Sequence, residues 1–506
     1  MTDSSPIMLS AKETSTSSPV PGEPQRSLTA IVARNSAFVL GSQAVLKVLA
    51  FLFNVYVVRR LGDVHFGQYS AVMAYVAIFA IFTDWGMAPY AVREMAEDHR
   101  RTSWLLPNIV AIRLVLSLII AVVAPLSAFW LGKGHEMALG VAIASAGLLI
   151  YAFQGPLDSA LTARERLDYT ATFSLISQLV FWSLGVLLLV RGMGFIGLLI
   201  ASLSGVAVIA VLSGWALFKM GIGRLVLSVR LWPKLLLNAL PFGISDIAYI
   251  LMQRFDTVLM SFLLTDAAVG WYNVPYTLIT MILLIAQSVA IAMYPSMVRG
   301  YQTAPQSLRD VTQRSIKYLL LVCLPLVVGG TILADRIIIM LYKNEFVNSV
   351  PVLQLMLWAL PSLFLLELLG RVANTLHLER KAARINVINA GITLLLDLVL
   401  IPTLGLTGGA LAWVIGRAVR LFQFWFLIGH DRLIGREWGP LLRVVLAAVL
   451  MGGAVFLLRN ANLFLCIGCG ALIYGGLLVA LRAIDRNELR FLLRLLLRRG
   501  KLEKAT

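Results

Sequence analysis

Residues 35–93 decide the fold and read NSAFVLGSQAVLKVLAFLFNVYVVRRLGDVHFGQYSAVMAYVAIFAIFTDWGMAPYAVR. In this stretch two apolar runs of about 25 residues each flank a short polar turn at residues 59–65. At a rise of about 1.5 Å per residue, each run forms a helix long enough to cross the roughly 30 Å hydrocarbon core of a membrane. The stretch therefore predicts two membrane-spanning helices joined by a turn.

Polar residues follow one face of each predicted helix. Lys47 shares a face with Gln43 and Asn54 in the first run, and Asp84 shares one with Ser70 in the second. An unpaired charge at the centre of a membrane helix costs about 2.5–3.5 kcal/mol, so Lys47 and Asp84 are expected to face protein or water. Two interpretations stay open: both residues belong to a binding site, or they form a structural pair that locks two helices.

The composition of the whole chain indicates a membrane protein. Of its 506 residues, 59% are hydrophobic and only 14% are charged, which excludes an ordinary soluble globular protein. The formal net charge of +17 would suit a nucleic-acid-binding protein, but the positive residues lie in loops between apolar runs and in a C-terminal tail. We therefore expect a polytopic, all-helical membrane protein with no nucleic-acid partner.

The apolar runs predict fourteen spans with no soluble domain between them. Residues 1–27 are rich in Ser, Thr and Pro, lack the apolar core of a signal peptide, and are expected to form a disordered cytoplasmic N-terminus. Residues 28–217 are predicted to hold spans 1–6, residues 234–429 spans 7–12, and residues 439–482 two further spans. The predicted spans are residues 31–58, 66–92, 104–130, 136–157, 169–190, 195–217, 234–263, 268–294, 315–341, 350–376, 384–402, 407–428, 439–458 and 462–482.

Lysine and arginine gather in alternate loops, which predicts the orientation of the chain. One side of the membrane collects about four times as many of these residues as the other, and that side includes both ends of the chain. Both termini are therefore expected in the cytoplasm, with residues 59–65 outside. In residues 485–504, arginine recurs every fourth position from Arg486 to Arg498 beside leucines. This tail predicts a basic amphipathic helix on the anionic inner leaflet, with a partner-binding helix as the alternative.

The chain also repeats itself at an offset of 203 residues. Asp63 aligns with Asp266 and Gly67 with Gly270, and further on GFIG (194–197) matches GLTG (405–408). Because the offset covers an even number of spans, the two six-helix copies have the same topology and form parallel repeats about an axis normal to the membrane. A substrate site is then expected at their interface, near the middle of the membrane.

Polar residues in the spans predict the chemistry of this site. The buried charges are mostly basic and suit a diphosphate, while tyrosines and amides suit sugar faces and hydroxyls. Arg254 lies too deep to reach the surface, so it faces a cavity or pairs across helices with a group such as Asp84. The candidate substrate-binding residues are Lys47, Asp84, Asp246, Tyr249, Gln253, Arg254, Asp256, Asn273, Tyr276, Gln287, Arg417 and Arg420.

Four more charged residues lie in or near apolar spans: Arg113, Glu367, Arg371 and Asp397. Glu367 and Arg371 are four residues apart on a helix, so one interpretation is that they simply satisfy each other. Asp84, Asp246 and Asp256 either neutralise the cations of the empty site or titrate. The residues form no catalytic or metal-ligating set.

Five motifs stand in order along the chain: TDWGMAPYAVREMA (83–96), QRFDTVLMSFLLTDAAVGWYNVPYTLI (253–279), AMYPSMVRGY (292–301), LYKNEFVNSVPVLQLMLWALP (341–361) and LLLDLVLIPTLGLTGGALA (394–412). In this order they resemble the Wzx-like polysaccharide flippases, a branch of the MATE/MOP transporter superfamily. The resemblance covers about residues 30–430. It departs at Asp397, where that family more often has Asn.

The resemblance implies a V-shaped pair of six-helix lobes that works by alternating access. Its substrate would be undecaprenyl-diphosphate-linked oligosaccharide, moved from the cytoplasmic to the outer leaflet of the bacterial cytoplasmic (inner) membrane for surface polysaccharide biosynthesis. Expected partners are this lipid-linked substrate, membrane lipids, and a polysaccharide polymerase with chain-length machinery. No cofactor is expected, and the coupling ion, H⁺ or Na⁺, stays open.

Other function classes are weighed against this one. A membrane glycosyltransferase, polymerase or ligase is disfavoured, because the chain has no large outer loop, no DxD in a cytosolic loop and no nucleophile motif. A phosphate-binding loop for ATP hydrolysis is also missing from the sequence. Within transporters, a drug/cation antiporter of the same superfamily and a lipid II flippase remain as alternatives.

The charge pattern makes a testable prediction about topology. Single cysteines placed in residues 93–103 and 299–314 should resist membrane-impermeant thiol reagents in intact cells and react only after permeabilisation, because the basic loops stay inside. A cysteine within residues 59–65 serves as the control that reacts from outside. Labelling from outside at residue 305 would reverse the orientation.

Overall fold

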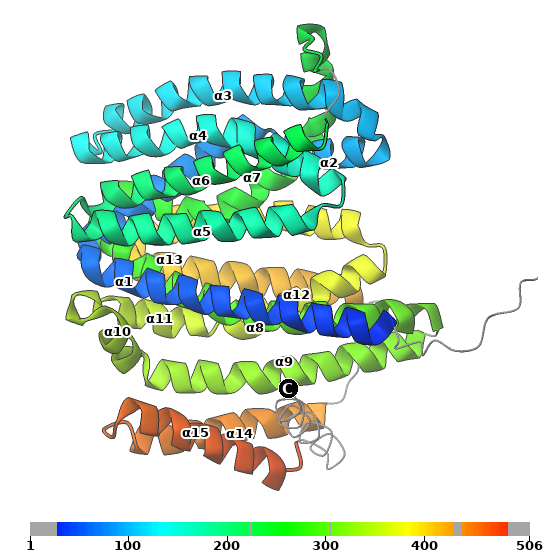
Figure 1. Cartoon of the computed structure of the whole chain (residues 1–506). Coiled ribbons are helices and arrows are strands. Elements are labelled where there is room, and N and C mark those ends of the chain that lie inside the picture. Colours follow the sequence, from blue (N-terminus) through cyan, green and yellow to red (C-terminus); the bar gives the residue numbers. More distant parts are fainter. Residues whose placement is uncertain (1–27, 222–224, 304, 430–437, 484–506) are drawn as a thin grey trace, which may run out of the picture. The chain divides into compact units, whose positions relative to one another are not determined.

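The computed structural model describes residues 28–221, 225–303, 305–429 and 438–483 (Figure 1). All secondary-structure elements in these ranges are α- or 3₁₀-helices, and the described part contains no β-strand. The predicted disorder of residues 1–27 and the predicted helix at 485–504 lie outside the described residues. The α-helices are α1 (Leu28–Asp84), α2 (Met87–Glu97), α3 (Thr102–Trp130), α4 (Gly134–Ala163), α5 (Leu167–Val190), α6 (Gly194–Lys219), α7 (Trp232–Leu263), α8 (Asp266–Thr303), α9 (Pro305–Ile332), α10 (Ala334–Tyr342), α11 (Ser349–Leu357), α12 (Leu360–Thr375), α13 (Glu379–Gly429), α14 (Trp438–Leu457) and α15 (Leu463–Ala480).

The chain divides into two units, residues 1–52 and residues 53–506. In the first unit helix α1 begins at Leu28, and Lys47 is exposed on it. The contacts described below all lie within the second unit.

Helices of the second unit pack in two groups (Figure 1). In the first, α3 packs on α4, α5 packs on α6, and α4 also contacts α2 and α6. In the second, α13 packs on α7 and α12, and α8 packs on α9, α11 and α12. We call residues 53–219 the N-terminal bundle and residues 232–429 the C-terminal bundle. Helices α14 and α15 pack on each other and on α9, where the Tyr474 hydroxyl donates to the carbonyl of Leu321 at 2.8 Å.

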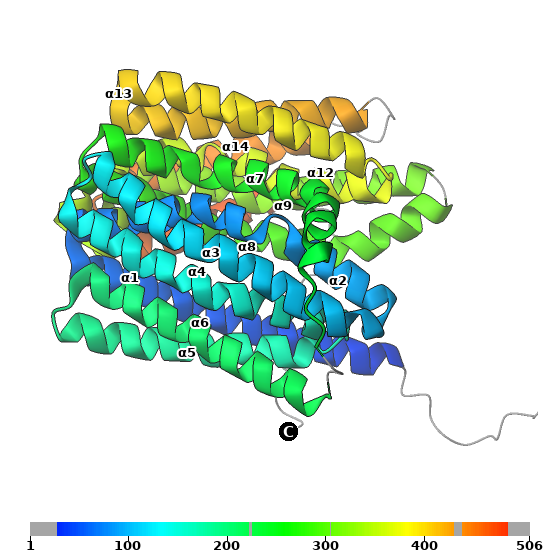
Figure 2. The ribbon, with the colours of Figure 1, turned by 90° about the horizontal axis from the view of Figure 1, so that it is seen from above.

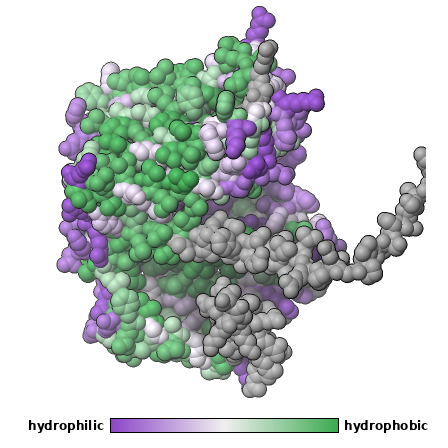
Figure 3. Space-filling model, in the orientation of Figure 1, coloured by the Kyte–Doolittle hydropathy of each residue, from purple (hydrophilic) through white to green (hydrophobic). Residues whose placement is uncertain are grey.

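Apolar length confirms the expected class of protein. Among the described residues, nine helices are long and apolar enough to cross a membrane, and eleven if each of two bent pairs counts as one span. Figure 3 shows hydrophobic residues over the middle of these helices, with hydrophilic residues gathered toward their ends. The all-helical membrane fold is therefore confirmed, whereas the count of fourteen spans is not.

Glycines with positive φ interrupt the two longest helices. Helix α13 is broken at Gly405 (φ 60°), and beyond the break the chain runs back along itself, as Figure 2 shows. The Asn389 side chain donates to the carbonyl of Gly416 at 3.0 Å, which ties the two halves together. Helix α1 is broken at Gly62 (φ 75°). Glycine suits both breaks because it adopts a positive φ without the steric penalty of a Cβ atom.

A different break was not expected from the sequence. Residues 66–92 are predicted as one helix, but α1 ends at Asp84 and α2 begins at Met87. Trp85 and Gly86 between them have φ of 51° and 76°. Gly86 lies against the backbone of α7, and a Cβ atom built on it would be 2.2 Å from the amide nitrogen of Gly243. The turn therefore lies where the two bundles make close backbone contact.

Two other predicted spans are also interrupted. Residues 315–341 are predicted as one helix, but α9 ends at Ile332 and the short α10 follows it. Residues 350–376 form α11 and α12, which meet at 44°. Proline in the first turn of α12 explains that bend, because it cannot donate the hydrogen bond that would continue the preceding helix.

At the end predicted to face outside, the bundles make a reciprocal contact. A Cβ atom on Gly67 would lie 1.7 Å from the carbonyl oxygen of Asp266, and one on Gly270 would lie 2.3 Å from that of Asp63. These four residues are the pairs that align at an offset of 203. The side-chain bonds are reciprocal too, and they involve one more aligned pair. Gln68 donates to Asp266 at 3.2 Å, and Trp271 donates to Asp63 at 3.1 Å.

Reciprocity of this kind is the signature of a two-fold axis, in which residue i contacts j and the equivalent of j contacts the equivalent of i. The contact therefore supports the parallel repeat inferred from the sequence. The domain boundaries at 28–217 and 234–429 stay predictions.

The connection between the bundles is held by one buried residue. Asn108 of α3 is fully buried and uses its whole hydrogen-bonding capacity. Its amide donates to the carbonyls of Trp104 at 2.6 Å and Val226 at 2.9 Å. Its oxygen accepts from the amide of Ser228 at 2.9 Å and the indole of Trp232 at 3.2 Å. The segment leading into α7 is thereby fixed to the N-terminal bundle.

The reciprocal glycine contact can be tested by adding a methyl group. Gly67→Ala should lower the thermal unfolding temperature in detergent, because overpacking against backbone costs about 1–3 kcal/mol. Gly370→Ala is the matched control: it is helical and has nothing within 4 Å of the new methyl group. It should be neutral or stabilising by roughly 0.5–1 kcal/mol. Equal unfolding temperatures for the two variants would contradict the contact.

Candidate functional site

A cavity of about 600 Å³ lies between the N-terminal bundle and α7. Its walls come from α1 and α3 to α6 on one side and from residues 246–250 on the other. Most of the lining is apolar, which is the usual character of a binding cavity. The polar side chains that line it include Asp84, Arg113, Tyr151, Gln178, Asp246 and Tyr249.

An ion pair occupies one wall of the cavity. Asp84 Oδ1 lies 2.6 Å from Arg113 Nη1, and only 7% of the arginine side chain is exposed. Gly155 of α4 leaves room for this guanidinium, because a Cβ atom there would lie 2.4 Å from Nη1. Of the two roles expected for Arg254, pairing with Asp84 is wrong, because Asp84 pairs with Arg113 of α3. A lone arginine in an apolar helix was the available signal, because such a charge needs a partner.

Asp246 faces the same cavity from α7. Within the described part of the chain it forms no hydrogen bond or ion pair. The described lining thus carries two carboxylates and one guanidinium, and that guanidinium is already paired. An available carboxylate can accept hydrogen bonds from hydroxyl groups or hold a cation.

Gln253 joins three helices of the C-terminal bundle. Its side-chain oxygen accepts from the Tyr276 hydroxyl and from Arg417 Nη2, each at 3.2 Å. Its amide donates to the Tyr249 hydroxyl at 3.3 Å. The Arg417 guanidinium also stacks over Trp413, 5.1 Å from the ring centroid, and the residue is only 3% exposed. The structure therefore brings four of the predicted site residues into one network, of which only Tyr249 reaches the cavity.

Two other predicted residues, Asp256 and Asn273, are buried and form hydrogen bonds within the C-terminal bundle. Asp256 accepts from the Tyr272 hydroxyl at 2.5 Å and from the amide of Thr257 at 2.6 Å. Asn273 is buried and donates to the carbonyl of Val269 at 2.9 Å. Neither residue lines the cavity.

The expected pairing of Glu367 with Arg371 also needs correction, because Gln287 contacts Glu367. The Gln287 amide donates to Glu367 at 3.3 Å. Arg371 instead lies over the ring of Tyr294, 6.0 Å from the centroid. Since no ion pair joins Glu367 to Arg371 within the described residues, the interpretation that they satisfy each other is not supported.

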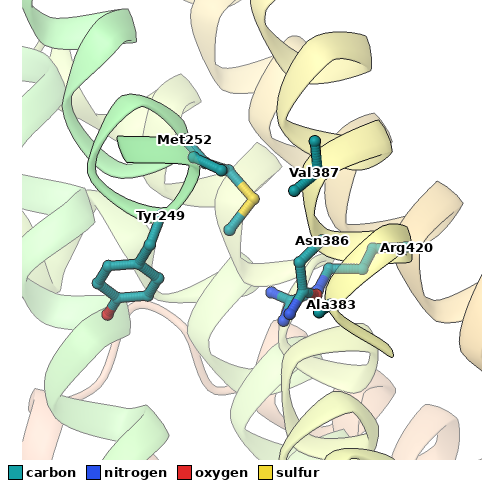
Figure 4. A pocket seen from close by; sticks show the side chains of 7 residues that line it. Tyr249, Met252, Ala383, Asn386, Val387 and Arg420 are labelled. Carbon is teal, nitrogen blue, oxygen red and sulfur yellow. The ribbon is translucent and has the colours of Figure 1, made fainter. Parts of the chain in front are cut away.

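A smaller pocket of about 80 Å³ also has Tyr249 in its lining (Figure 4). Tyr249 and Met252 of α7 line one side of it, and Asn386, Val387 and Arg420 of α13 line the other. The Arg420 Nε atom is buried and has no hydrogen-bond partner in the described residues. Tyr249 therefore lines two spaces, one with carboxylates and one with a cation.

Arg254 and Lys47 complete the predicted set. Arg254 is half-buried on α7 and forms no hydrogen bond or ion pair with any described residue. It lies close enough to interact electrostatically with Tyr69 of the N-terminal bundle and Tyr276 of the C-terminal bundle. Lys47 belongs to the first unit, and its part in the site stays a prediction.

Comparison with known proteins places the chain in a family. The family model described as "Polysaccharide biosynthesis protein" matches residues 32–301, more than half of the chain. The chain belongs to this polysaccharide biosynthesis protein family. A second model, described as "Lipid II flippase MurJ", matches residues 230–468. A curated relative, the probable low-salt glycan biosynthesis flippase Agl15 of Haloferax volcanii, is 24% identical over 463 residues, covering 88% of this chain and 95% of the relative.

Solved structures share the fold of this polysaccharide biosynthesis family member. The lipid II flippase MurJ in an inward closed conformation matches with a TM-score of 0.68 and 17% identity, over 87% of this chain and all of that chain. An inward-facing multidrug resistance MATE family transporter of the MOP superfamily matches with a TM-score of 0.53 and 17% identity, over 76% of this chain and 94% of that chain. The resemblance to MOP-superfamily flippases inferred from the five motifs is confirmed.

The ion pair in the cavity of this family member yields a stability prediction. Arg113→Leu should cost about 3 kcal/mol of unfolding free energy in detergent, because it leaves the Asp84 carboxylate without its partner. Adding Asp84→Asn should restore most of that loss. Asp246→Asn is the matched control, since this carboxylate has no partner to lose. A single Arg113→Leu variant as stable as the double variant would show that the pair does not stabilise the fold.

Proposed function

We propose that this protein is a transporter that flips undecaprenyl-diphosphate-linked oligosaccharide from the cytoplasmic to the outer leaflet during surface polysaccharide biosynthesis. The observation that carries the proposal is a largely apolar cavity with a few polar groups between two pseudo-symmetric bundles. Membership of the polysaccharide biosynthesis family and the name of the Haloferax relative, a glycan biosynthesis flippase, support the same function.

Alternating access is the proposed mechanism. The bundles touch at Gly67 and Gly270 near one end of the helices and at Gly86 and Gly243 near the other, with the cavity lining between these points. Backbone-to-backbone contacts without side chains can separate without breaking an interdigitated core. In the proposed cycle one contact opens while the other stays closed, and the lipid tail remains in the bilayer.

Substrate recognition is proposed to use groups from both spaces that Tyr249 lines. Its ring and hydroxyl suit a sugar, with Asp246 and Gln178 as hydrogen-bonding partners for sugar hydroxyls. The diphosphate needs cations, and Arg254 and Arg420 have no ion-pair partner among the described residues. Proton or Na⁺ coupling through Asp246 is proposed, because this carboxylate has no partner in the described cavity lining.

The setting of this transport is part of the proposal. We place the protein in the bacterial cytoplasmic membrane with both termini in the cytoplasm. It would hand its product to a polysaccharide polymerase and chain-length machinery, and it would act by binding and conformational change, without covalent chemistry. The match of residues 230–468 to the lipid II flippase model favours lipid II as the second candidate substrate.

Arg254 gives the sharpest test of the proposed function. Arg254→Ala should reduce surface polysaccharide more than about tenfold and leave protein abundance near normal, because a charge-assisted hydrogen bond contributes about 1.5–3 kcal/mol. Lipid-linked oligosaccharide should accumulate on the cytoplasmic side, and Arg254→Lys should keep partial activity. Immunoblots of polysaccharide and extraction of the lipid-linked precursor measure both effects.

A matched control separates a binding role from a general effect of charge. Arg443→Ala removes an exposed arginine that donates to the carbonyl of Arg482, far from the cavity lining, and should leave export unchanged. Normal export by a stable Arg254→Ala protein would remove Arg254 from the site. Rescue of a lipid II flippase deficiency by the wild-type chain, with no effect on polysaccharide, would favour the second candidate.

A further inference from the structure

A charged pocket separate from the central cavity lies where the two bundles meet near the break in α1. Its volume is about 460 Å³, and none of its residues lines the cavity of Asp84 and Asp246. The pocket is lined by Tyr56, Arg59, Arg60, Leu61 and Gly62 from α1 and by Lys343 and Glu345 from the segment after α10. Three cations and one carboxylate thus share a small open space.

Arg59 holds the two walls of this pocket together. Its Nε atom donates to the carbonyl of Leu341 at 2.6 Å, and its Nη2 atom donates to the carbonyl of Met340. These carbonyls belong to the last turn of α10, where no further helical amide is available to bind them. The positive guanidinium also suits the negative end of the helix dipole. Arg59 is therefore occupied by the protein itself.

Trp271 also holds the walls of this pocket together. The indole nitrogen of Trp271 donates to Asp63 Oδ2 at 3.1 Å and to the carbonyl of Glu345 at 3.0 Å. The segment after α10 is thus anchored to both bundles, and the pocket is preorganised by bonds that do not involve its remaining cations.

Those remaining cations are Arg60 and Lys343. Both are exposed, and neither side chain forms a hydrogen bond or ion pair with a described residue. Glu345 is the one carboxylate in the lining, and it makes no ion pair within the described part either. Two available cations beside Arg59 leave an excess of positive charge, which attracts an anion.

The backbone conformation of Lys343 also indicates a binding site. Its φ is 69° and its ψ is 179°, a region that is essentially restricted to glycine. A lysine here strains the backbone where a glycine would not. Strained residues of this kind cluster at active sites and ligand-binding sites.

We propose that this pocket is an anion site that binds a phosphate group through Arg60 and Lys343, while Arg59 and Trp271 hold its walls. The phosphate has two possible sources, a lipid headgroup at the membrane surface or a soluble phosphate compound. The chemistry is the same for both: a phosphate oxygen accepts charge-assisted hydrogen bonds from a guanidinium and an ammonium.

The test measures binding of inorganic pyrophosphate to the full chain in phosphatidylcholine nanodiscs by equilibrium dialysis at low ionic strength. The wild type should show saturable binding. Arg60→Ala and Lys343→Gly should each weaken it about tenfold or more, because each removes a charge-assisted contact. Glu345→Gln should strengthen it, because the substitution removes a repelling carboxylate from the lining.

Two further measurements keep the test specific. Arg459→Ala removes another exposed arginine, which lies over the Phe456 ring outside the pocket, and should leave binding unchanged. Lys343→Gly should also raise the thermal unfolding temperature, because glycine relieves the backbone strain. Weaker binding by a more stable protein cannot be attributed to misfolding.

The outcomes are distinct from those of the transport assay, because no step requires flipping. The proposal is overturned if pyrophosphate does not bind, if Arg60→Ala and Lys343→Gly bind like the wild type, or if Arg459→Ala weakens binding equally. Replacing part of the phosphatidylcholine by phosphatidylglycerol separates the sources. Competition assigns the site to a lipid headgroup, and unchanged pyrophosphate binding assigns it to a soluble phosphate compound.

Discussion

The architecture of the second unit depends on one close approach, in which two backbones meet without side chains at Gly67 and Gly270. Any Cβ atom at either glycine would enter the partner backbone, so the contact tolerates no other residue in this geometry. The carboxylates of Asp63 and Asp266 then accept bonds from Trp271 and Gln68 across the same seam. With this point fixed, the bundles can share a cavity, and the anchored segment after α10 can reach from one to the other.

The residues of this contact, though not the contact itself, could be identified from the sequence. The repeat at an offset of 203 paired Asp63 with Asp266 and Gly67 with Gly270 before any geometry was known, because duplicated halves retain the residues that face their common axis. The break at Trp85 and Gly86 was not predicted, and it coincides with the approach of α7, about 150 residues later in the chain. Local patterns carry no information about a neighbour so distant in sequence.

For the candidate site, too, the sequence indicated which residues are involved but not how they pair. Tyr249, Gln253, Tyr276 and Arg417 are among the residues that the sequence pattern proposed for substrate binding, and they lie in one hydrogen-bonded network. The pattern did not reveal which cations are already bound. Arg113 was noted as a buried charge, yet its pairing with Asp84 depends on the register of α3 against α1. Counting the charged residues in the apolar spans therefore predicts a cavity rich in cations. The described lining instead holds two carboxylates, Asp84 and Asp246, and one guanidinium, Arg113.

The fixed connection at Asn108 has a consequence for dividing the gene. A chain cut after Lys219 would leave Asn108 and Trp104 on one fragment and Val226, Ser228 and Trp232 on the other. Three of the four bonds of this fully buried amide would then have to form between separate molecules. Coexpressed halves would assemble through this buried polar contact. The N-terminal fragment on its own would keep only one of the four hydrogen bonds of the Asn108 side chain, the bond to Trp104.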